Sequence, residues 1–546
     1  MDTKEIITKE IFTIESLPPE QRARSIIASP YTGQIMANMP VQDIHLILKE
    51  SWEDDASILL NYVSEKQFPS LVDLDCWRAE TLSIPNFLNW METLLTASEQ
   101  SYVRAMESLD IEIVMILFQD HMEVTPAVQS DDNIPDLMDA GFESLDSMFF
   151  FRFLRDDEEN RILRECLKTI FSSLPSLYFD LMSSMGWETR ASLEETAYER
   201  RVSRLMELGF VPRETALGIY HLQSPERILS KRKDHRLMPV SISGEYRLPG
   251  IYKEGLDGPA DLIDQAIEHS DDERITTFGF EMVYLVNKVI MADFMPVNDS
   301  TEIKRCVGKT RRMVCLGLEI ATRQKGLDAK DILNEMNAEA LFSLAYNMIV
   351  RQQKRLKSVL KYRQMDMIPL SDRNRVEGLM KKRPMYGDRP FEGMDDLKTI
   401  TSMVGRITAM ADIMACLDWE DQADNMEKTN AKNKDALDME NIILTSLASN
   451  VTGKGLVFSP LDPDQLRSFL DTTTQLDHAG TRKLMPSFGP DMATLLASVN
   501  TGLSRETCHD LSEALVKRLD LEISGLEDTS QIDPRFITCL IVKLRD

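Results

Sequence analysis

Apolar residues recur along this chain at the three- and four-residue spacing of amphipathic helices, and the alternating pattern of strands is rare. In the N-terminal part this pattern predicts short helices of about 8 to 14 residues. They start at Pro18-Pro19-Glu20 and cover residues 41–49, 54–63, 84–97, 98–109 and 111–122. Ser64 to Gln67 has the form of a capping box, which predicts a further helix from Phe68. We therefore expect a stack of short helices over the first 125 residues.

The signals around residue 209 predict a helical hairpin. Leu205 and Leu208 close an amphipathic helix, and Gly209 can supply the left-handed backbone that ends it. Phe210 is then placed to pack back, and Pro212 stands where a next helix begins.

Longer helices are predicted in the rest of the chain. They cover residues 274–291, 300–323, 328–334, 338–363, 397–417, 464–472, 492–499, 505–519 and 534–544. Proline and glycine gather at 239–258, 382–393 and 453–463, which predicts loops there, and the charged stretch 420–434 is expected to be an exposed connector.

The fold class predicted from these patterns is all-α. We expect a multi-lobed array of short and then longer helices, with at most a small β-hairpin near 239–258. The expected parts are a short-helix array at 1–125, a helical hairpin domain at 126–238, a linker at 239–258, a long-helix domain with a basic segment at 259–383, and a C-terminal helical domain at 384–546.

The composition is that of a globular protein, with 546 residues, 43% hydrophobic residues and a mean hydropathy of -0.24. The apolar runs at 111–118 and 282–294 are broken by charges and are shorter than the roughly 20 residues that cross a bilayer. Charges interrupt residues 1–12, so a secretory signal is not expected. Seven scattered cysteines are typical of a reducing compartment. We expect a cytoplasmic protein without a transmembrane segment.

Charge is segregated along the chain. Between Glu302 and Arg383, 19 Lys and Arg residues stand against 9 Asp and Glu residues, an excess of +10. The whole chain carries -27, which leaves -37 for the remainder. Two interpretations are open: acidic helices of the same chain neutralise the basic segment, or the segment docks an anionic partner.

The candidate patch for an anionic partner follows the predicted helix at 338–363, where cations lie off the apolar stripe of Leu341, Leu344, Met348 and Leu356, and continues beyond it. Its residues are Arg351, Lys354, Arg355, Lys357, Lys361, Arg363, Arg373, Arg375, Lys381, Lys382 and Arg383. The partner would be an acidic protein, a nucleic acid or a lipid headgroup surface. Only Tyr346, Tyr362 and Tyr386 lie nearby, which gives weak support for the stacking of single-stranded bases.

The candidate catalytic and metal-binding motifs in this sequence are incomplete. Gly308-Lys309-Thr310 lacks the first glycine of a phosphate loop, because position 303 is Ile. Cys306 and Cys315 lie nine residues apart, on opposite faces of a predicted helix. Asp73-Leu74-Asp75 could suggest a divalent cation site, but a helix end with Trp77 packed inward is the preferred interpretation. No catalytic residue, metal ligand or cofactor is predicted.

Three segments resemble landmarks of a bacterial protein family known only as a domain of unknown function. They are Asp73 to Arg78, Arg204 to Phe210, and Met282 to Phe294 followed by Leu316 to Ile320. The resemblance implies an all-helical cytosolic protein with no assigned activity. Met39 to Trp77 is also similar to the short helical repeats of the cytosolic domain of magnesium transporters and of flagellar motor switch proteins, but no functional residue matches closely enough to be transferred.

The leading functional hypothesis is a non-catalytic interaction or scaffold protein with an unknown protein partner, because helix arrays present extended docking surfaces. The first alternative is an anion-binding module that uses the basic helix at 351–363 for nucleic acid or a membrane surface. The second is an enzyme with a pocket between lobes.

Overall fold

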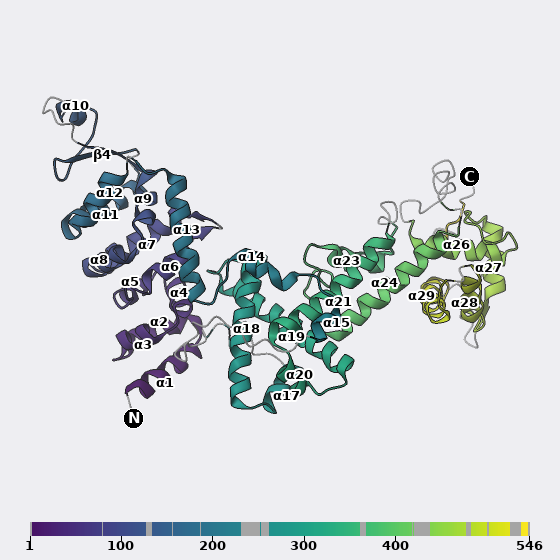
Figure 1. Cartoon of the computed structure of the whole chain (residues 1–546). Coiled ribbons are helices and arrows are strands. Elements are labelled where there is room, and N and C mark those ends of the chain that lie inside the picture. Colours follow the sequence, from purple (N-terminus) through teal and green to yellow (C-terminus); the bar gives the residue numbers. More distant parts are fainter. Residues whose placement is uncertain are drawn as a thin grey trace. The chain divides into compact units, whose positions relative to one another are not determined.

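In the computed structural model, almost every element is a helix, which confirms the all-α prediction (Figure 1). The structure describes residues 3–78, 80–126, 134–154, 157–185, 187–230, 250, 252, 261–360, 367–417, 419, 437–476, 482–499, 502–524 and 537–543. The chain forms two compact units, residues Met1–Ser343 (unit 1) and Leu344–Asp546 (unit 2).

Unit 1 begins with short helices. Their bounds are α1 Thr3–Glu15, α2 Pro19–Ala28, α3 Thr32–Asn38, α4 Val41–Glu50, α5 Ala56–Leu60, α6 Phe68–Asp75, α7 Ile84–Ala97, α8 Glu99–Ser108, α9 Ile111–Gln119, α10 Ile134–Asp139, α11 Glu158–Ser173, α12 Pro175–Ser184 and α13 Arg190–Glu207.

These helices stack, and α13 packs along α9 and α6 (Figure 1). Their apolar faces meet in a core that fully buries Phe87, Trp90, Tyr102 and Phe118. A helix this short is marginal alone, so its stability comes from burying its apolar face against neighbours. The short helices are therefore stable because they stack, and this is the arrangement that the sequence predicts.

Local hydrogen bonds and backbone geometry mark the helix start predicted at Phe68 and the helix end predicted at Gly209. Ahead of α6, the Ser64 amide donates to Gln67 Oε1 at 3.0 Å, but the Ser64 hydroxyl also donates to that oxygen, at 2.9 Å, instead of accepting from the Gln67 amide. After α13, Gly209 adopts φ +83° and the Phe210 amide donates to the Leu205 carbonyl at 2.9 Å. Pro212 then begins α14 (Arg213–Ala216), as predicted.

Three small antiparallel ribbons were not predicted. They pair β1 Trp77–Arg78 with β2 Thr81–Leu82, β3 Met122–Pro126 with β4 Phe149–Phe153, and β5 Thr474–Leu476 with β6 Arg482–Leu484. The run Phe149 to Phe153 holds four phenylalanines, and such aromatic density favours strands over helices. That local signal could have identified the longest ribbon.

Longer helices complete unit 1. They follow α14, the 3-10 helix η2 Leu217–Tyr220 and α15 Pro225–Ser230, and their bounds are α17 Leu262–Glu268, α18 Asp272–Asp293, α19 Ser300–Lys325, α20 Ala329–Glu335 and α21 Ala338–Val359, whose later part belongs to unit 2. The helices predicted at 274–291, 300–323 and 328–334 are confirmed by α18, α19 and α20.

Among the described residues, α18 is the one helix long and apolar enough to cross a membrane by length and composition alone. It packs against α14 and α19, and its buried polar residues have partners inside the protein. Arg274 pairs with Glu281 at 3.0 Å, and Lys288 pairs with Glu339 at 2.7 Å. These contacts are those of a core helix.

Unit 2 contains the later part of α21, followed by α23 Leu370–Met380, α24 Met394–Met414, α26 Met439–Val451, α27 Pro463–Thr473, α28 Phe488–Val499 and α29 Arg505–Ile523. Helix α24 packs on α26 and α29, and α28 packs on α29. The helix predicted to reach Arg363 ends at Val359, and residues 361–366 lie outside the described part.

The helix predicted at 534–544 is wrong over residues 537–543, which form an irregular, non-helical segment with a bend at Cys539 and Leu540. Glu522 accepts hydrogen bonds from the amides of Thr538 and Cys539, at 2.6 and 3.0 Å. Further along, Val542 pairs in parallel with Leu461. Tertiary partners therefore take the amides that a helix would have used internally.

The predicted linker at 239–258 lies outside the described residues except for Gly250 and Tyr252, and the connector predicted at 420–434 lies wholly outside them. The division of the chain into five parts stays a prediction.

Helix α19 crosses the start of α21 at very close range. A Cβ added at Gly317 would lie 2.0 Å from the Leu341 carbonyl oxygen, which belongs to the backbone and cannot rotate away. We expect Gly317→Ala to lower the free energy of unfolding by about 2 kcal/mol or more.

Gly308→Ala, in the same helix, is the matched control, because its nearest neighbour is the movable end of the Arg312 side chain at 3.4 Å. It should gain about 0.5 to 1 kcal/mol from helix propensity. Urea unfolding followed by circular dichroism measures both changes. Equal effects of the two substitutions would contradict the close crossing.

Candidate functional site

The second half of α21 separates a buried side from a cationic side. Gln352, Gln353 and Leu356 are buried. Arg351, Lys354, Arg355 and Lys357 are exposed. No acidic residue occurs between 351 and 360. Among the described residues, these four cations have no ion-pair partner.

The other predicted patch residues lie on α23 and in the loop after it, or outside the described part. Arg373, Lys381 and Lys382 are exposed, whereas Arg375 and Arg383 are partly buried. Arg375 lies 3.6 Å from Asp372, and Lys381 lies 3.7 Å from Asp388. Lys361 and Arg363 fall among residues 361–366, outside the described part. We use the term cationic surface for Arg351, Lys354, Arg355, Lys357, Arg373, Lys381 and Lys382.

Two backbone contacts fix the loop beside α21. Gln353 Nε2 donates to the carbonyls of Leu379 and Lys381, at 2.7 and 2.9 Å. A Cβ at Gly378 would lie 2.3 Å from the Gly387 carbonyl oxygen, so the loop lies directly against α23. Lys381 and Lys382 are therefore held close to the cations of α21.

The first half of the basic segment is different, because carboxylates of unit 1 pair with several of its cations. Arg311 lies 2.9 Å from Asp261 and 2.7 Å from Asp264, and Lys309 pairs with Asp293. Burial lowers the pKa of Arg311, but the hydrogen bonds that Arg311 donates to Asp264 and Asp261 outweigh this effect and raise the pKa overall. Neutralisation within the chain thus describes these residues, whereas Arg351, Lys354, Arg355 and Lys357 of the cationic surface have no ion-pair partner among the described residues.

The described aromatic side chains near the cationic surface are buried or make contacts within the protein. Tyr346 is buried, and Tyr362 lies outside the described residues. Tyr386 accepts a hydrogen bond from Arg375 Nε at 3.2 Å and lies edge-on to Phe391. The described tyrosines thus offer no open ring for base stacking.

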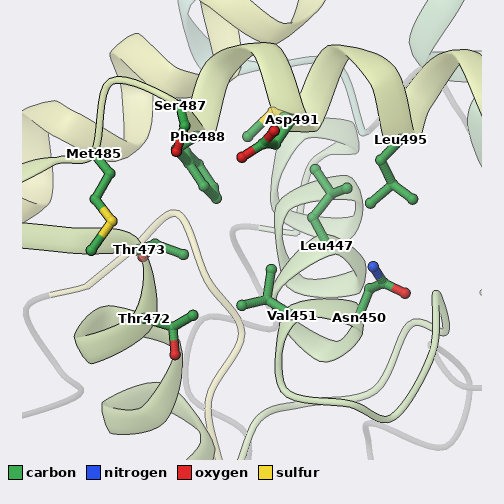
Figure 2. Close-up of a pocket in the computed structure, with 11 residues that line it drawn as sticks. Leu447, Asn450, Val451, Thr472, Thr473, Met485, Ser487, Phe488, Asp491 and Leu495 are labelled. Atoms are coloured by element: carbon green, nitrogen blue, oxygen red, sulfur yellow. The ribbon is translucent and has the colours of Figure 1, made fainter.

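A pocket of about 300 Å³ opens in unit 2 between α26, α27 and α28 (Figure 2). Leu447 and Val451 from α26 face Phe488 and Leu495 from α28 across it. Hydroxyl groups of Thr472, Thr473 and Ser487 lie at its edge with Asn450 and Asp491. No sequence pattern indicates this pocket, because the apolar spacing within each of the three helices does not reveal how they pack around a gap.

The carboxylates Asp73 and Asp75, considered above as a cation site, are buried and occupied by donors. Arg204 donates to both oxygens of Asp73, at 2.6 and 3.0 Å. Asp75 accepts from Trp90 Nε1 at 2.8 Å, and from Lys49 and Asn298. Among the described residues, no group of three or more His, Cys, Asp and Glu residues could hold a metal ion.

These networks shift the pKa values of their members. Burial raises the pKa of Asp75, but the His45 ring 3.6 Å away, the hydrogen bond from Trp90 and the charge of Lys49 outweigh it, so the net pKa is well below the ordinary 3.8. Burial lowers the pKa of Arg204, but its bonds to Asp73 and Asp110 raise it overall. Burial also raises the pKa of Cys166 and of Cys306 to about 12, so these thiols are protonated at neutral pH and are poor nucleophiles.

Because the folded-state pKa of Asp75 is depressed, its ionised form stabilises the protein above the ordinary pKa of 3.8, and this contribution is lost as pH falls below that value. We expect Asp75→Asn to cost about 2 kcal/mol or more at neutral pH. The urea midpoint of Asp75→Asn should lie below that of wild type by a constant amount from about pH 8 to 5. Below about pH 4 this difference should become smaller.

Asp395→Asn is the control, because the Asp395 side chain is 95% exposed and its ion pair with Lys398 lies at the surface. It should change the midpoint little at any pH. A difference for Asp75→Asn that does not narrow at low pH would show that the ionised carboxylate is not the stabilising species.

Comparison with models of protein families gives a match over residues 8–543. No curated protein and no solved structure matches the chain. The similarity of the N-terminal part to magnesium transporters is therefore not shown, whereas the resemblance to an uncharacterised family is confirmed. The match extends over both units and includes the buried Asp73–Arg204 pair and the cationic surface. The chain belongs to the "Family of unknown function (DUF6178)".

Proposed function

We propose that this protein is a non-catalytic, cytoplasmic interaction protein that docks an acidic protein partner on its cationic surface. The observation that carries the proposal is the exposed row of Arg351, Lys354, Arg355 and Lys357, which has no acidic partner among the described residues of a chain with net charge -27.

Repulsion between the like charges of this row destabilises α21 in the free protein. Arg351 and Arg355 are four residues apart, and Lys354 lies three residues from both Arg351 and Lys357, so like charges are neighbours on the helix surface. Each such pair destabilises a helix by about 0.2 to 0.5 kcal/mol. An acidic partner would relieve this repulsion, which supports a binding role.

An acidic protein suits the surface better than a nucleic acid does. The described tyrosines near it are buried or engaged, so bases would find no stacking platform. The remaining -37 of the chain would also repel a long polyanion more strongly than a short acidic segment. Charge complementarity of this kind gives specificity and a fast association rate.

The cytoplasmic location is supported by the cysteines. All seven are free, and all but Cys416 are buried. Buried thiols without disulfides are typical of proteins kept in a reducing compartment.

The test uses two variants of the tagged full-length protein with the same net charge. One carries Arg351→Glu, Lys354→Glu and Arg355→Glu. The control carries Lys9→Glu, Arg161→Glu and Lys168→Glu, whose exposed cations each pair with a glutamate of their own helix. Proteins bound from nuclease-treated source lysate at about 50 mM salt are identified by mass spectrometry and re-bound in purified form.

We expect one acidic protein to bind wild type and control alike and to lose at least about tenfold in affinity for the α21 variant, with the interaction weakening as salt rises. Equal binding to both variants would reject the cationic surface as the dock. Recovery of nucleic acid before nuclease treatment, lost only with the α21 variant, would favour the anion-binding alternative instead.

A further inference from the structure

A second pocket, of about 450 Å³, lies within unit 1 where the short-helix stack meets the longer helices. Its walls come from the end of α6 and β1, from α13 and α14, and from the end of α18 with the segment after it (Figure 1). The volume falls in the range of pockets for small molecules.

The walls combine flat apolar surfaces with cations. Trp77 and Tyr198 form an aromatic side, and Ile290 and Phe294 come from the α18 side. The Arg201 guanidinium stacks over the Trp77 ring at 5.3 Å, and the Arg213 guanidinium lies 3.4 Å above the Phe294 ring. Two guanidinium groups therefore frame one apolar slot.

Two buried donors at this pocket have no hydrogen-bond partner among the described residues. Trp77 is 8% exposed, and its indole Nε1 is unpartnered. Arg213 Nε is buried and unpartnered as well. Leaving a buried donor unsatisfied costs about 1 to 3 kcal/mol, and buried donors in native proteins are almost always paired with a protein group, a water molecule or a ligand.

The carboxylates that line the pocket do not accept hydrogen bonds from these two donors. Asp75 is occupied by Trp90, Lys49 and Asn298. Glu80 and Glu214 are exposed. Burial also lowers the pKa of Arg201, and the nearby Asp73 offsets this only in part, so an added negative charge would stabilise the guanidinium.

We propose that this pocket binds a small organic anion with a flat apolar body, whose acidic group pairs with the Arg213 guanidinium while its body lies between the aromatic side chains. The site is independent of the cationic surface, which belongs to unit 2.

The test uses the full-length protein with ¹⁵N-labelled tryptophan and benzoate as the probe. The five indole N–H groups give separate signals in transverse-relaxation-optimised spectra, and Trp77→Phe assigns the signal of Trp77. A molecule of this size is expected to bind with a dissociation constant of about 1 mM. Benzyl alcohol lacks the charge, and acetate lacks the flat body, so both serve as control probes.

We expect benzoate to shift the Trp77 signal with saturation, and neither control probe to do so. Arg213→Gln should weaken benzoate binding by at least roughly tenfold. Arg227→Gln removes an exposed arginine that does not line the pocket and should leave binding unchanged. Absence of a saturable Trp77 shift at about 20 mM benzoate, or equal affinity in a folded Arg213→Gln variant, would overturn the proposal.

Discussion

Two buried carboxylates on one short helix are the constraint on which the arrangement of unit 1 depends. An ionised Asp in an apolar core costs several kcal/mol unless donors surround it, so α6 can be buried only where they converge. Asp73 obtains them from Arg204 on α13. Asp75 obtains them from α4, α7 and the segment after α18. The stack, the long helix beside it and the later helices are thereby held in one geometry, and the same geometry forms the unit 1 pocket.

The basic segment likewise has two parts, which differ in whether their cations are paired with carboxylates. Its earlier cations, such as Lys309 and Arg311, are bound to carboxylates of unit 1 and act as structural groups. Its later cations on α21 face solvent beside Gln352 and Gln353, whose amide groups lie on the buried side. A formal excess of charge spread over 82 residues is thus concentrated by the fold onto one helix face, where opposite charge in a partner would act most strongly.

The pocket of unit 1 and the cationic surface present different chemistry to their surroundings. The surface offers mobile ammonium and guanidinium groups in water, where attraction is long-ranged and screened by salt. The pocket offers the Trp77 ring and the Arg213 guanidinium in a slot with largely apolar walls, where a contact between charges is stronger than it is in water. The two features suit ligands of the same sign but of very different size.

Local patterns in the sequence determined the helices, because apolar spacing, the cap at Ser64 and the glycine at 209 act within a few residues. They also placed Arg351 and Lys354 off the apolar stripe of their helix. Only the tertiary structure decided which cations are neutralised, that Asp73 meets Arg204, and that residues 537–543 are not helical. Asp73 and Arg204 are more than a hundred residues apart in the chain, and the amides of Thr538 and Cys539 are bound by Glu522 instead of by a helix of their own. Spacing along a chain carries no information about such encounters, since they depend on which faces pack together.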